Sequence, residues 1–139
     1  MYKYLYPDKT CVLLYKGRII YESRENNVRP LIRYLMENGI PQKGVILIDK
    51  VVGTAVSNLI LYCKIKMVYA KVISKPALSL LIKHKVKIDY RELTENILRL
   101  DKTDICPLEK TIMGISDYDE AVKTLFKIVG EKILITPKK

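Results

Sequence analysis

A short uncharged segment followed directly by a helical pattern is the feature that most constrains how this chain folds. Residues 44–48, Gly-Val-Ile-Leu-Ile, are typical of a strand that is buried on both faces. Asp49 then supplies a side-chain oxygen of the kind that begins helices, and the pattern predicts a helix from Lys50 to about Tyr62. Ligands of open α/β sheets bind where a strand turns into a helix, so the sequence predicts a site at this junction.

The patterns before this junction predict a hairpin and a helix. Residues 11–16 and 19–23 are rich in β-branched and aromatic side chains, and Gly17-Arg18 between them favours a type II′ turn. Asn26 and Asn27 are candidate caps for a helix over 28–37, with Pro30 in its first turn.

The patterns after the junction alternate between strands and helices. Strands are expected over 67–73 and 86–90, the second of them at an edge, and a helix that Ser74 caps is expected between them. A further helix is expected over 91–100, and a short one is expected to end near Gly114. Ser116 and Asp119 resemble a capping box, which predicts the start of a last helix.

This order of elements predicts the α/β class. We expect a three-layer αβα sandwich around a five-stranded mixed sheet, made of an N-terminal hairpin and three parallel strands. One domain is expected over residues 1–139, with its core at about 11–126 and a flexible tail at 131–139.

Composition favours a soluble protein. No apolar run approaches the roughly 18 residues that span a membrane, and the first residues lack the apolar segment of a signal peptide. The three cysteines, Cys11, Cys63 and Cys106, are odd in number and widely spaced, so a disulfide framework is not expected. Free cysteines fit a reducing compartment, and we therefore expect a cytoplasmic location.

The net charge of +10 is concentrated in the first part of the chain. Residues 1–87 carry 16 basic and 5 acidic side chains, whereas residues 88–139 carry 9 and 10. A basic region can recruit polyanions, which predicts weak, non-specific nucleic-acid binding at most. The alternative is that Lys is simply abundant throughout the sequence, and both interpretations stay open.

Ligands for a metal are scarce in this sequence. His84 is the single histidine, and no two His or Cys residues have the spacing of a zinc site, so we expect neither a metal nor another cofactor. Gly-rich phosphate loops are also absent from the sequence. An anion would therefore bind the open backbone N–H groups at the start of the helix from Lys50.

Three residues are candidates for catalysis: Asp49, Lys50 and Cys106. A cation in the first helical turn opposes the helix dipole, so Lys50 is expected to hold an anion or to act as an amine nucleophile. Cys106 lies in a polar connector before a helix, where a thiol can be activated. The structural alternatives are a helix cap for Asp49, a solvated side chain for Lys50 and a buried apolar role for Cys106.

Residues expected around the same site form a second group. Arg29 begins a helix against the dipole and is expected to face an anion, whereas Glu109 either contacts ligand or caps its own short helix. The full set of candidate ligand-binding residues is Arg29, Gly53, Thr54, Thr103 and Glu109.

Six blocks of the sequence resemble a small prokaryotic family of unassigned function, domain-of-unknown-function family 1893. The blocks are residues 14–23 (LYKGRIIYES), 29–31 (RPL), 48–53 (IDKVVG), 68–70 (VYA), 72–74 (VIS) and 105–110 (ICPLEK). The resemblance covers roughly residues 11–126. It implies a cytidine-deaminase-like fold, and it implies no particular reaction.

The resemblance also implies that the zinc site of deaminases is missing. Zinc deaminases carry H-x-E at one helix start and P-C-x-x-C at the next. The corresponding residues here are 28–30 (VRP) and 49–53 (DKVVG), with Lys50 and Gly53 in place of the cysteines. The chain departs from its family's pattern at Asn27 and Asp104, where the family has Gly.

Two functions from different classes follow from these observations. The first is a metal-free enzyme or a binder of a small, nucleotide-like anion, with its pocket at the junction of Asp49 and Lys50. The alternative is a non-enzymatic basic module that binds nucleic acid or an acidic protein. The sequence predicts no membrane partner, and it leaves open whether the chain is an enzyme and whether it forms a homo-oligomer.

Overall fold

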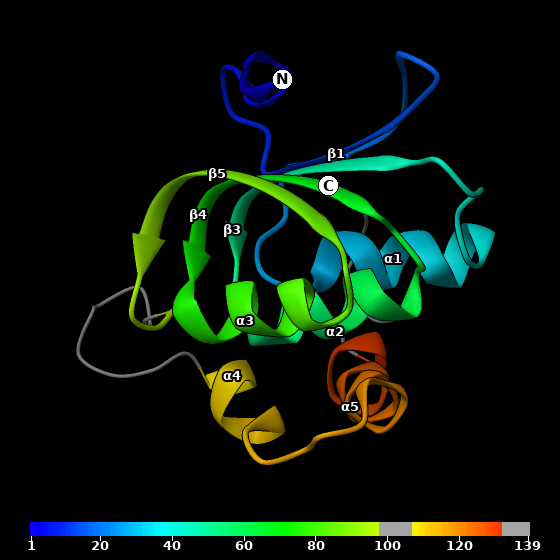
Figure 1. Ribbon diagram of the computed structural model, residues 1–139. Helices are drawn as coiled ribbons and strands as arrows, with labels where there is room; N and C mark the ends of the chain where they lie inside the picture. Colours follow the sequence, from blue (N-terminus) through cyan, green and yellow to red (C-terminus); the bar gives the residue numbers. More distant parts are fainter. Residues whose placement is uncertain (98–106, 132–139) are drawn as a thin grey trace.

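A computed structural model describes residues 1–97 and 107–131, apart from the side chain of Pro107. Figure 1 shows an α/β structure in which strands and helices alternate from β2 to β5. The described elements are η1 (Tyr2–Leu5), β1 (Cys11–Tyr15), β2 (Arg18–Ser23), α1 (Arg29–Asn38), β3 (Ile46–Val52), α2 (Thr54–Tyr62), β4 (Met67–Ser74), α3 (Lys75–Lys83), β5 (Lys87–Thr94), α4 (Pro107–Ile112), α5 (Tyr118–Leu125) and η2 (Phe126–Gly130).

The strands form a mixed sheet in the order β2-β1-β3-β4-β5. β1 pairs antiparallel with β2 and β3, whereas β3, β4 and β5 are parallel to one another. Helices α2 and α3 connect the parallel strands, because such strands need a crossover of a dozen or more residues. The prediction of an α/β fold with a hairpin and three parallel strands is confirmed.

The hairpin turn differs from the predicted one. Tyr15 pairs with Arg18, so the loop residues are Lys16 and Gly17, whose φ angles are 50° and 79°. Positive φ at both loop positions is the signature of a type I′ turn, and a type II′ turn has it only at the first. The turn therefore begins one residue earlier than predicted.

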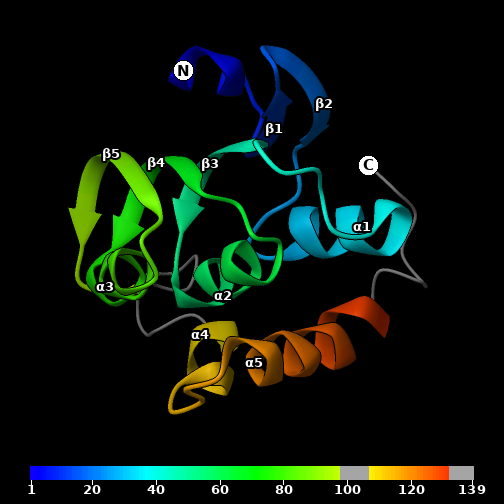
Figure 2. The same ribbon diagram turned by 45° about the vertical axis from the view of Figure 1, so that its right-hand side comes forward.

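Layers of unequal size cover the two faces of the sheet. Helices α1, α2 and α3 lie against one face, and the short η1 lies on the opposite face (Figure 1). Helices α4 and α5 lie on the side of α2 that faces away from the sheet, with α5 packed along α2 (Figure 2). The arrangement fits the predicted three-layer sandwich, although among the described residues only η1 represents the helical layer on one side.

Two clusters of buried side chains hold these layers together. The larger lies between the sheet and the helices and contains Leu13, Leu47, Ile32, Leu59 and Leu81, each 2% exposed or less. The smaller lies under η1 and contains Leu5, Val12, Leu14 and Ile48. Successive residues from Cys11 to Leu14 and from Val45 to Ile48 alternate between the two clusters, which explains why residues 44–48 carry no charge.

A buried ion pair fixes the segment that leads into α1. The Arg33 Nε and Nη2 groups donate to the two carboxylate oxygens of Glu25 at 2.6 and 3.1 Å, and both side chains are buried. The hydrogen bond to Glu25 raises the pKa of Arg33. A bidentate pair of this kind restricts both direction and distance, so it sets the angle at which the chain enters α1.

Helix starts agree only in part with the predicted caps. Ser74 caps α3 as predicted, since its hydroxyl accepts the Ala77 N–H at 3.3 Å. Helix α1 begins after Val28 without a side-chain cap, so neither Asn26 nor Asn27 has the expected role. Helix α5 begins after Asp117, whose carboxylate accepts the Asp119 N–H at 3.0 Å, and not after Ser116.

The prediction of a helix over 91–100 is wrong for residues 91–97, the part of this range that the structure describes. β5 continues to Thr94, because Glu92, Leu93 and Thr94 stay paired with β4. The predicted edge position of β5 is confirmed. No helix in the described part of the chain is long and apolar enough to cross a membrane.

Candidate functional site

The junction between β3 and α2 lies further along the chain than predicted. β3 continues through Asp49 and Lys50 to Val52, and α2 begins at Thr54 with Gly53 as its N-cap residue. The strand continues because the β-branched Val51 and Val52 pair with β4. The predicted helix start at Lys50 is therefore wrong, and Asp49 does not cap α2.

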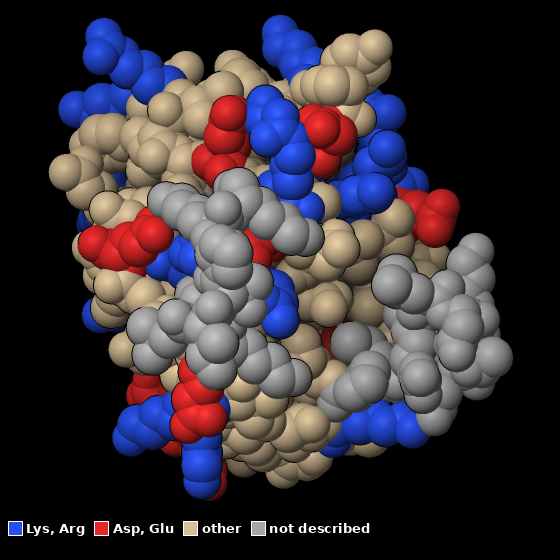
Figure 3. Space-filling model, turned by 180° about the vertical axis from the view of Figure 1, so that it is seen from behind, with Lys and Arg blue, Asp and Glu red and all other residues tan. Residues whose placement is uncertain are grey.

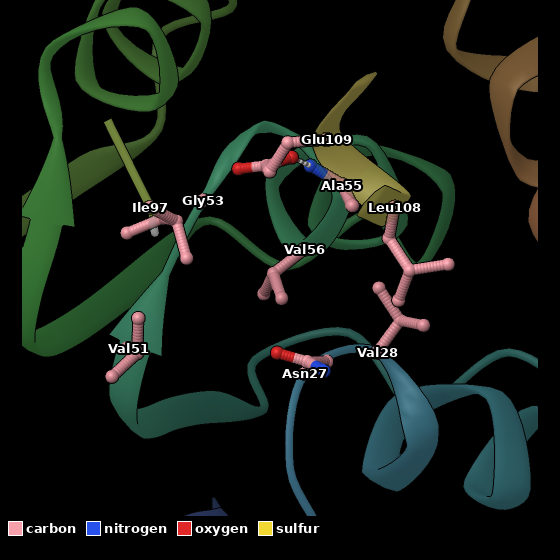
Figure 4. Close-up of a pocket in the computed structure, with 9 residues that line it drawn as sticks. All are labelled: Asn27, Val28, Val51, Gly53, Ala55, Val56, Ile97, Leu108 and Glu109. Atoms are coloured by element: carbon pink, nitrogen blue, oxygen red, sulfur yellow. Dashed lines mark hydrogen bonds between the residues drawn. The ribbon is translucent and has the colours of Figure 1, made fainter. Parts of the chain in front are cut away.

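Glu109 caps α2 from a distant part of the chain. Its Oε1 accepts the Thr54 N–H at 2.6 Å, and its Oε2 accepts the Ala55 N–H at 2.7 Å. Figure 4 shows the carboxylate reaching the start of α2 from α4. Both oxygens thus satisfy backbone donors that have no partner within the helix, and a negative charge here suits the helix dipole.

Gly53 makes room for this cap. A Cβ atom at this position would overlap Oε1 of Glu109 and would come within 2.7 Å of Cγ1 of Ile97. The φ of Gly53 is −101°, so the close approach of these side chains, and not the backbone angle, calls for glycine.

Two cavities meet at Glu109. The smaller has a volume of about 20 Å³, enough for a single water molecule, and lies between Asn27 and Val28 at the start of α1 and the start of α2 (Figure 4). The larger, called here the α2–α4 cleft, has a volume of about 220 Å³. Its lining residues are Thr54, Ser74, Pro76, Asn96, Ile97, Glu109, Ile112, Met113, Gly114 and Ile115.

The Glu109 side chain is only 8% exposed although it lines both cavities. Burial raises the pKa of Glu109, while the hydrogen bonds from Ala55 and Thr54 act in the opposite direction. The carboxyl group thus faces a cleft whose other walls are mostly apolar.

Asp49 is a buried acid on the helix-facing side of the sheet. It is 5% exposed and pairs with Cys11 of β1 and Ala70 of β4, which both belong to the larger core. Burial raises the pKa of Asp49 to about 8, although the Val51 N–H donates to Oδ1 at 3.3 Å. Burial thus favours the protonated form of Asp49, which can act as a hydrogen-bond donor.

Lys50 points away from Asp49. Successive side chains of a strand point to opposite faces, and Lys50 is exposed. The expectation that Lys50 lies in the first turn of a helix is therefore wrong. Arg29 is the first residue of α1 and is half-buried, and the described lining of the two cavities does not include it.

The structure thus brings together three of the predicted residues, Gly53, Thr54 and Glu109. Cys106 and Thr103 lie outside the described residues. Asn96 and Ile97, which also line the α2–α4 cleft, were not predicted, because the helix expected over 91–100 gave them no distinct role. Among the described residues, no three His, Cys, Asp or Glu side chains gather closely enough to hold a metal ion.

Comparisons with known proteins identify relatives without assigning an activity. Residues 1–129 match the model of a family described as "TM1506: Domain of unknown function (DUF1893)". A crystal structure of a DUF1893 family protein (TM1506) from Thermotoga maritima is similar, with a TM-score of 0.78 and 31% sequence identity. The match covers 86% of this chain and 80% of that one. No protein of curated function matches the sequence.

Proposed function

The chain belongs to the DUF1893 family, and because the description of that family names no activity, we propose from the geometry that it binds a small nucleoside-like molecule in the α2–α4 cleft. The observation that carries the proposal is the buried carboxyl group of Glu109, held at the start of α2 and lining a cleft at the carboxyl ends of parallel strands. Ligands of open α/β sheets bind at such ends.

The chemistry of the cleft favours a planar ligand that carries N–H donors. Each Glu109 oxygen accepts one backbone N–H and keeps further acceptor capacity, and Asn96 adds both a donor and an acceptor. Ile97, Ile112 and Ile115 supply apolar surface for the faces of a ring. A nucleobase combines polar edges with apolar faces, so it matches both parts of the lining.

The size of the cleft limits the ligand. A volume of about 220 Å³ is below the roughly 300–1,000 Å³ of typical small-molecule sites. A nucleobase or a nucleoside is therefore favoured over a dinucleotide. The proposal replaces Lys50 by Glu109 as the anchor, so the ligand is held by its N–H groups and not by a negative charge.

A deaminase-like fold is part of this proposal. The order hairpin, helix, strand, helix, strand, helix, strand agrees with the order that the family resemblance implies. Zinc deaminases hold their metal with His and Cys side chains at two helix starts. The starts of α1 and α2 carry neither His nor Cys, so these residues do not fit zinc, and no step here involves a metal.

Roles in catalysis for Asp49, Lys50 and Cys106 stay predictions, as does a cytoplasmic location. Asp49 supports a role in proton transfer only if a ligand reaches it, and the described lining of the two cavities does not include it. The proposed function is therefore the binding of a nucleoside-like molecule, without a catalytic step.

A titration monitored by NMR tests the proposal. Cytidine, uridine, adenosine and guanosine are added separately at millimolar concentrations to protein labelled with ¹⁵N. We expect at least one of them to shift the amide signals of Thr54, Asn96 and Ile115, because these residues line the cleft. The variant Asn96→Ala should weaken binding at least several-fold, since it removes hydrogen bonds to the ligand.

The matched control is Asn38→Ala, which removes an exposed side chain at the end of α1, outside the described lining of either cavity. It should leave the affinity unchanged. The proposal is wrong if none of the four nucleosides binds, or if the shifted signals belong to residues away from the cleft.

A further inference from the structure

Three basic residues stand side by side across the parallel strands. The register pairs Asp49 with Ala70 and Val51 with Val72, which places Lys50 of β3 beside Lys71 of β4. The register of β4 and β5 likewise places Lys71 beside Arg91. We call Lys50, Lys71 and Arg91 the cation row. Neighbouring strands are about 4.8 Å apart, so the row spans about 10 Å.

The cation row lies on the face of the sheet that carries η1. Ile48 and Tyr69, two residues earlier on β3 and β4, belong to the small cluster under η1, and residues two apart on a strand share a face. Arg91 reaches the same face, because its guanidinium lies 4.5 Å from the centre of the Tyr2 ring. All three basic side chains are exposed.

Positive charges in adjacent positions of a sheet repel one another and reduce stability. No ion pair of the described residues involves the cation row. Asp89 is the acidic residue two positions before Arg91 on the same face. The repulsion within the row is thus an unfavourable feature of the isolated fold, and a negatively charged partner would relieve it.

The local arrangement is more specific than the net charge. On the face shown in Figure 3, Lys and Arg side chains are interspersed with Asp and Glu. The cation row differs, because its three members are held in line by the sheet. Aromatic rings border it, with Tyr2 in contact with Arg91 and the Tyr2 and Tyr69 rings edge to face at 6.0 Å.

We propose that the cation row and the adjoining tyrosines bind single-stranded nucleic acid. Proteins that bind single strands combine cations along the backbone with aromatic or guanidinium surfaces on which bases stack. The row supplies the cations, and Tyr2 with Arg91 supplies a stacking surface. This surface lies on the opposite face of the sheet from the helices and is independent of the α2–α4 cleft.

Fluorescence anisotropy with a dye-labelled oligothymidine tests this proposal in the full-length protein. Charge reversal at the centre of the row, Lys71→Glu, should weaken binding at low salt by about tenfold or more. The logarithm of the binding constant should fall with the logarithm of salt concentration with a slope of about −2 for three phosphate contacts, and Lys71→Glu should reduce that slope.

The matched control is Lys43→Glu, which changes the net charge equally. Lys43 is exposed in the loop before β3, at the opposite end of that strand from Lys50. The Lys43→Glu substitution should weaken binding less than about twofold, since Lys43 would contact no phosphate of a strand bound along the cation row. Circular dichroism of both variants checks that they remain folded. If Lys71→Glu unfolds the protein, Lys71→Gln, which removes the positive charge without reversing it, takes its place.

Three results would overturn the proposal. One is the absence of oligothymidine binding at low salt. Another is equal weakening by Lys71→Glu and Lys43→Glu, which would mean that only the net charge matters. The last is tighter binding to duplex DNA or to vesicles of anionic lipid than to the single strand, because the row would then serve a different partner.

Discussion

Glu109 occupies the space that a side chain at position 53 would need. The Glu109 carboxylate bonds to the Thr54 and Ala55 N–H groups, and a Cβ atom on Gly53 would overlap its Oε1 atom. Capping and glycine are therefore two parts of one arrangement, in which α4 is attached to the start of α2. The same contact forms a wall of the proposed ligand cleft.

Gly53→Ala should destabilise the fold by about 1.5–3 kcal/mol, because Oε1 of Glu109 must move and lose its charge-assisted hydrogen bond from the Thr54 N–H. Urea unfolding measures the loss. Gly130→Ala is the matched control, since its Cβ would meet Met36 and Phe126 at ordinary distances of 3.9 Å, and its effect should stay within about 1 kcal/mol.

Combining Gly53→Ala with Glu109→Ala separates the two causes. If Glu109 is the obstacle, the double variant should be more stable than the sum of the single losses implies. Strict additivity would show that the cost at position 53 has another origin, such as the contact with Ile97.

Glu109→Gln should reduce stability by about 1–3 kcal/mol, since the amide keeps one acceptor oxygen and turns an N–H₂ group toward the second backbone donor. The signals of Thr54 and Ala55 should also exchange faster with deuterium. Glu120→Gln, an exposed change in the first turn of α5, should alter stability by less than about 0.5 kcal/mol. Equal effects of the two changes would contradict the capping role of Glu109.

The sheet could be predicted from the sequence because its signals are local. Val, Ile, Leu and Tyr dominate the strand segments, and helices of ten or so residues between them require parallel pairing. The helix predicted over 91–100 was wrong because edge strand β5 is polar and mostly exposed, so its pattern differs little from that of a surface helix.

The site was harder to predict because its central contact joins distant residues. Asp49 has the side chain of a helix cap, but pairing of Val51 and Val52 with β4 keeps the chain extended, and this depends on tertiary structure. The residue that does cap α2 lies 55 positions after Thr54. No periodicity or spacing in one sequence connects two such positions, although the acidic character of Glu109 made it a candidate.

Cys11 and Cys63 should resist alkylation in the native protein. They are 0% and 2% exposed, and burial raises the pKa of both thiols, so neither forms the reactive thiolate near neutral pH. Treatment with iodoacetamide followed by peptide mass spectrometry should locate modification at Cys106, which is predicted to be reactive. Rapid labelling of Cys11 or Cys63 without denaturant would show that these side chains are not buried.

Asp49 should make the protein less stable as pH rises through neutrality. Its pKa is raised by burial to about 8, whereas an aspartate in the unfolded chain titrates near 3.9. Between these values the folded state binds a proton that the unfolded state has released. The free energy of unfolding therefore falls as pH rises, by about 1.4 kcal/mol per pH unit from this residue. Below about pH 4 both states are protonated and the contribution is constant.

The variant Asp49→Asn isolates this contribution, because an amide resembles a protonated carboxyl group and does not titrate. Urea unfolding at pH 4, 6 and 8 should show similar stability of the two proteins at pH 4 and a growing advantage for the variant at higher pH. Asp89→Asn, which also removes one carboxyl group but from an exposed position, is the matched control. A constant difference between Asp49→Asn and wild type across this range would mean that the buried carboxyl group is ionised in the folded protein, and that solvent or a cation reaches it beneath α1 and α2.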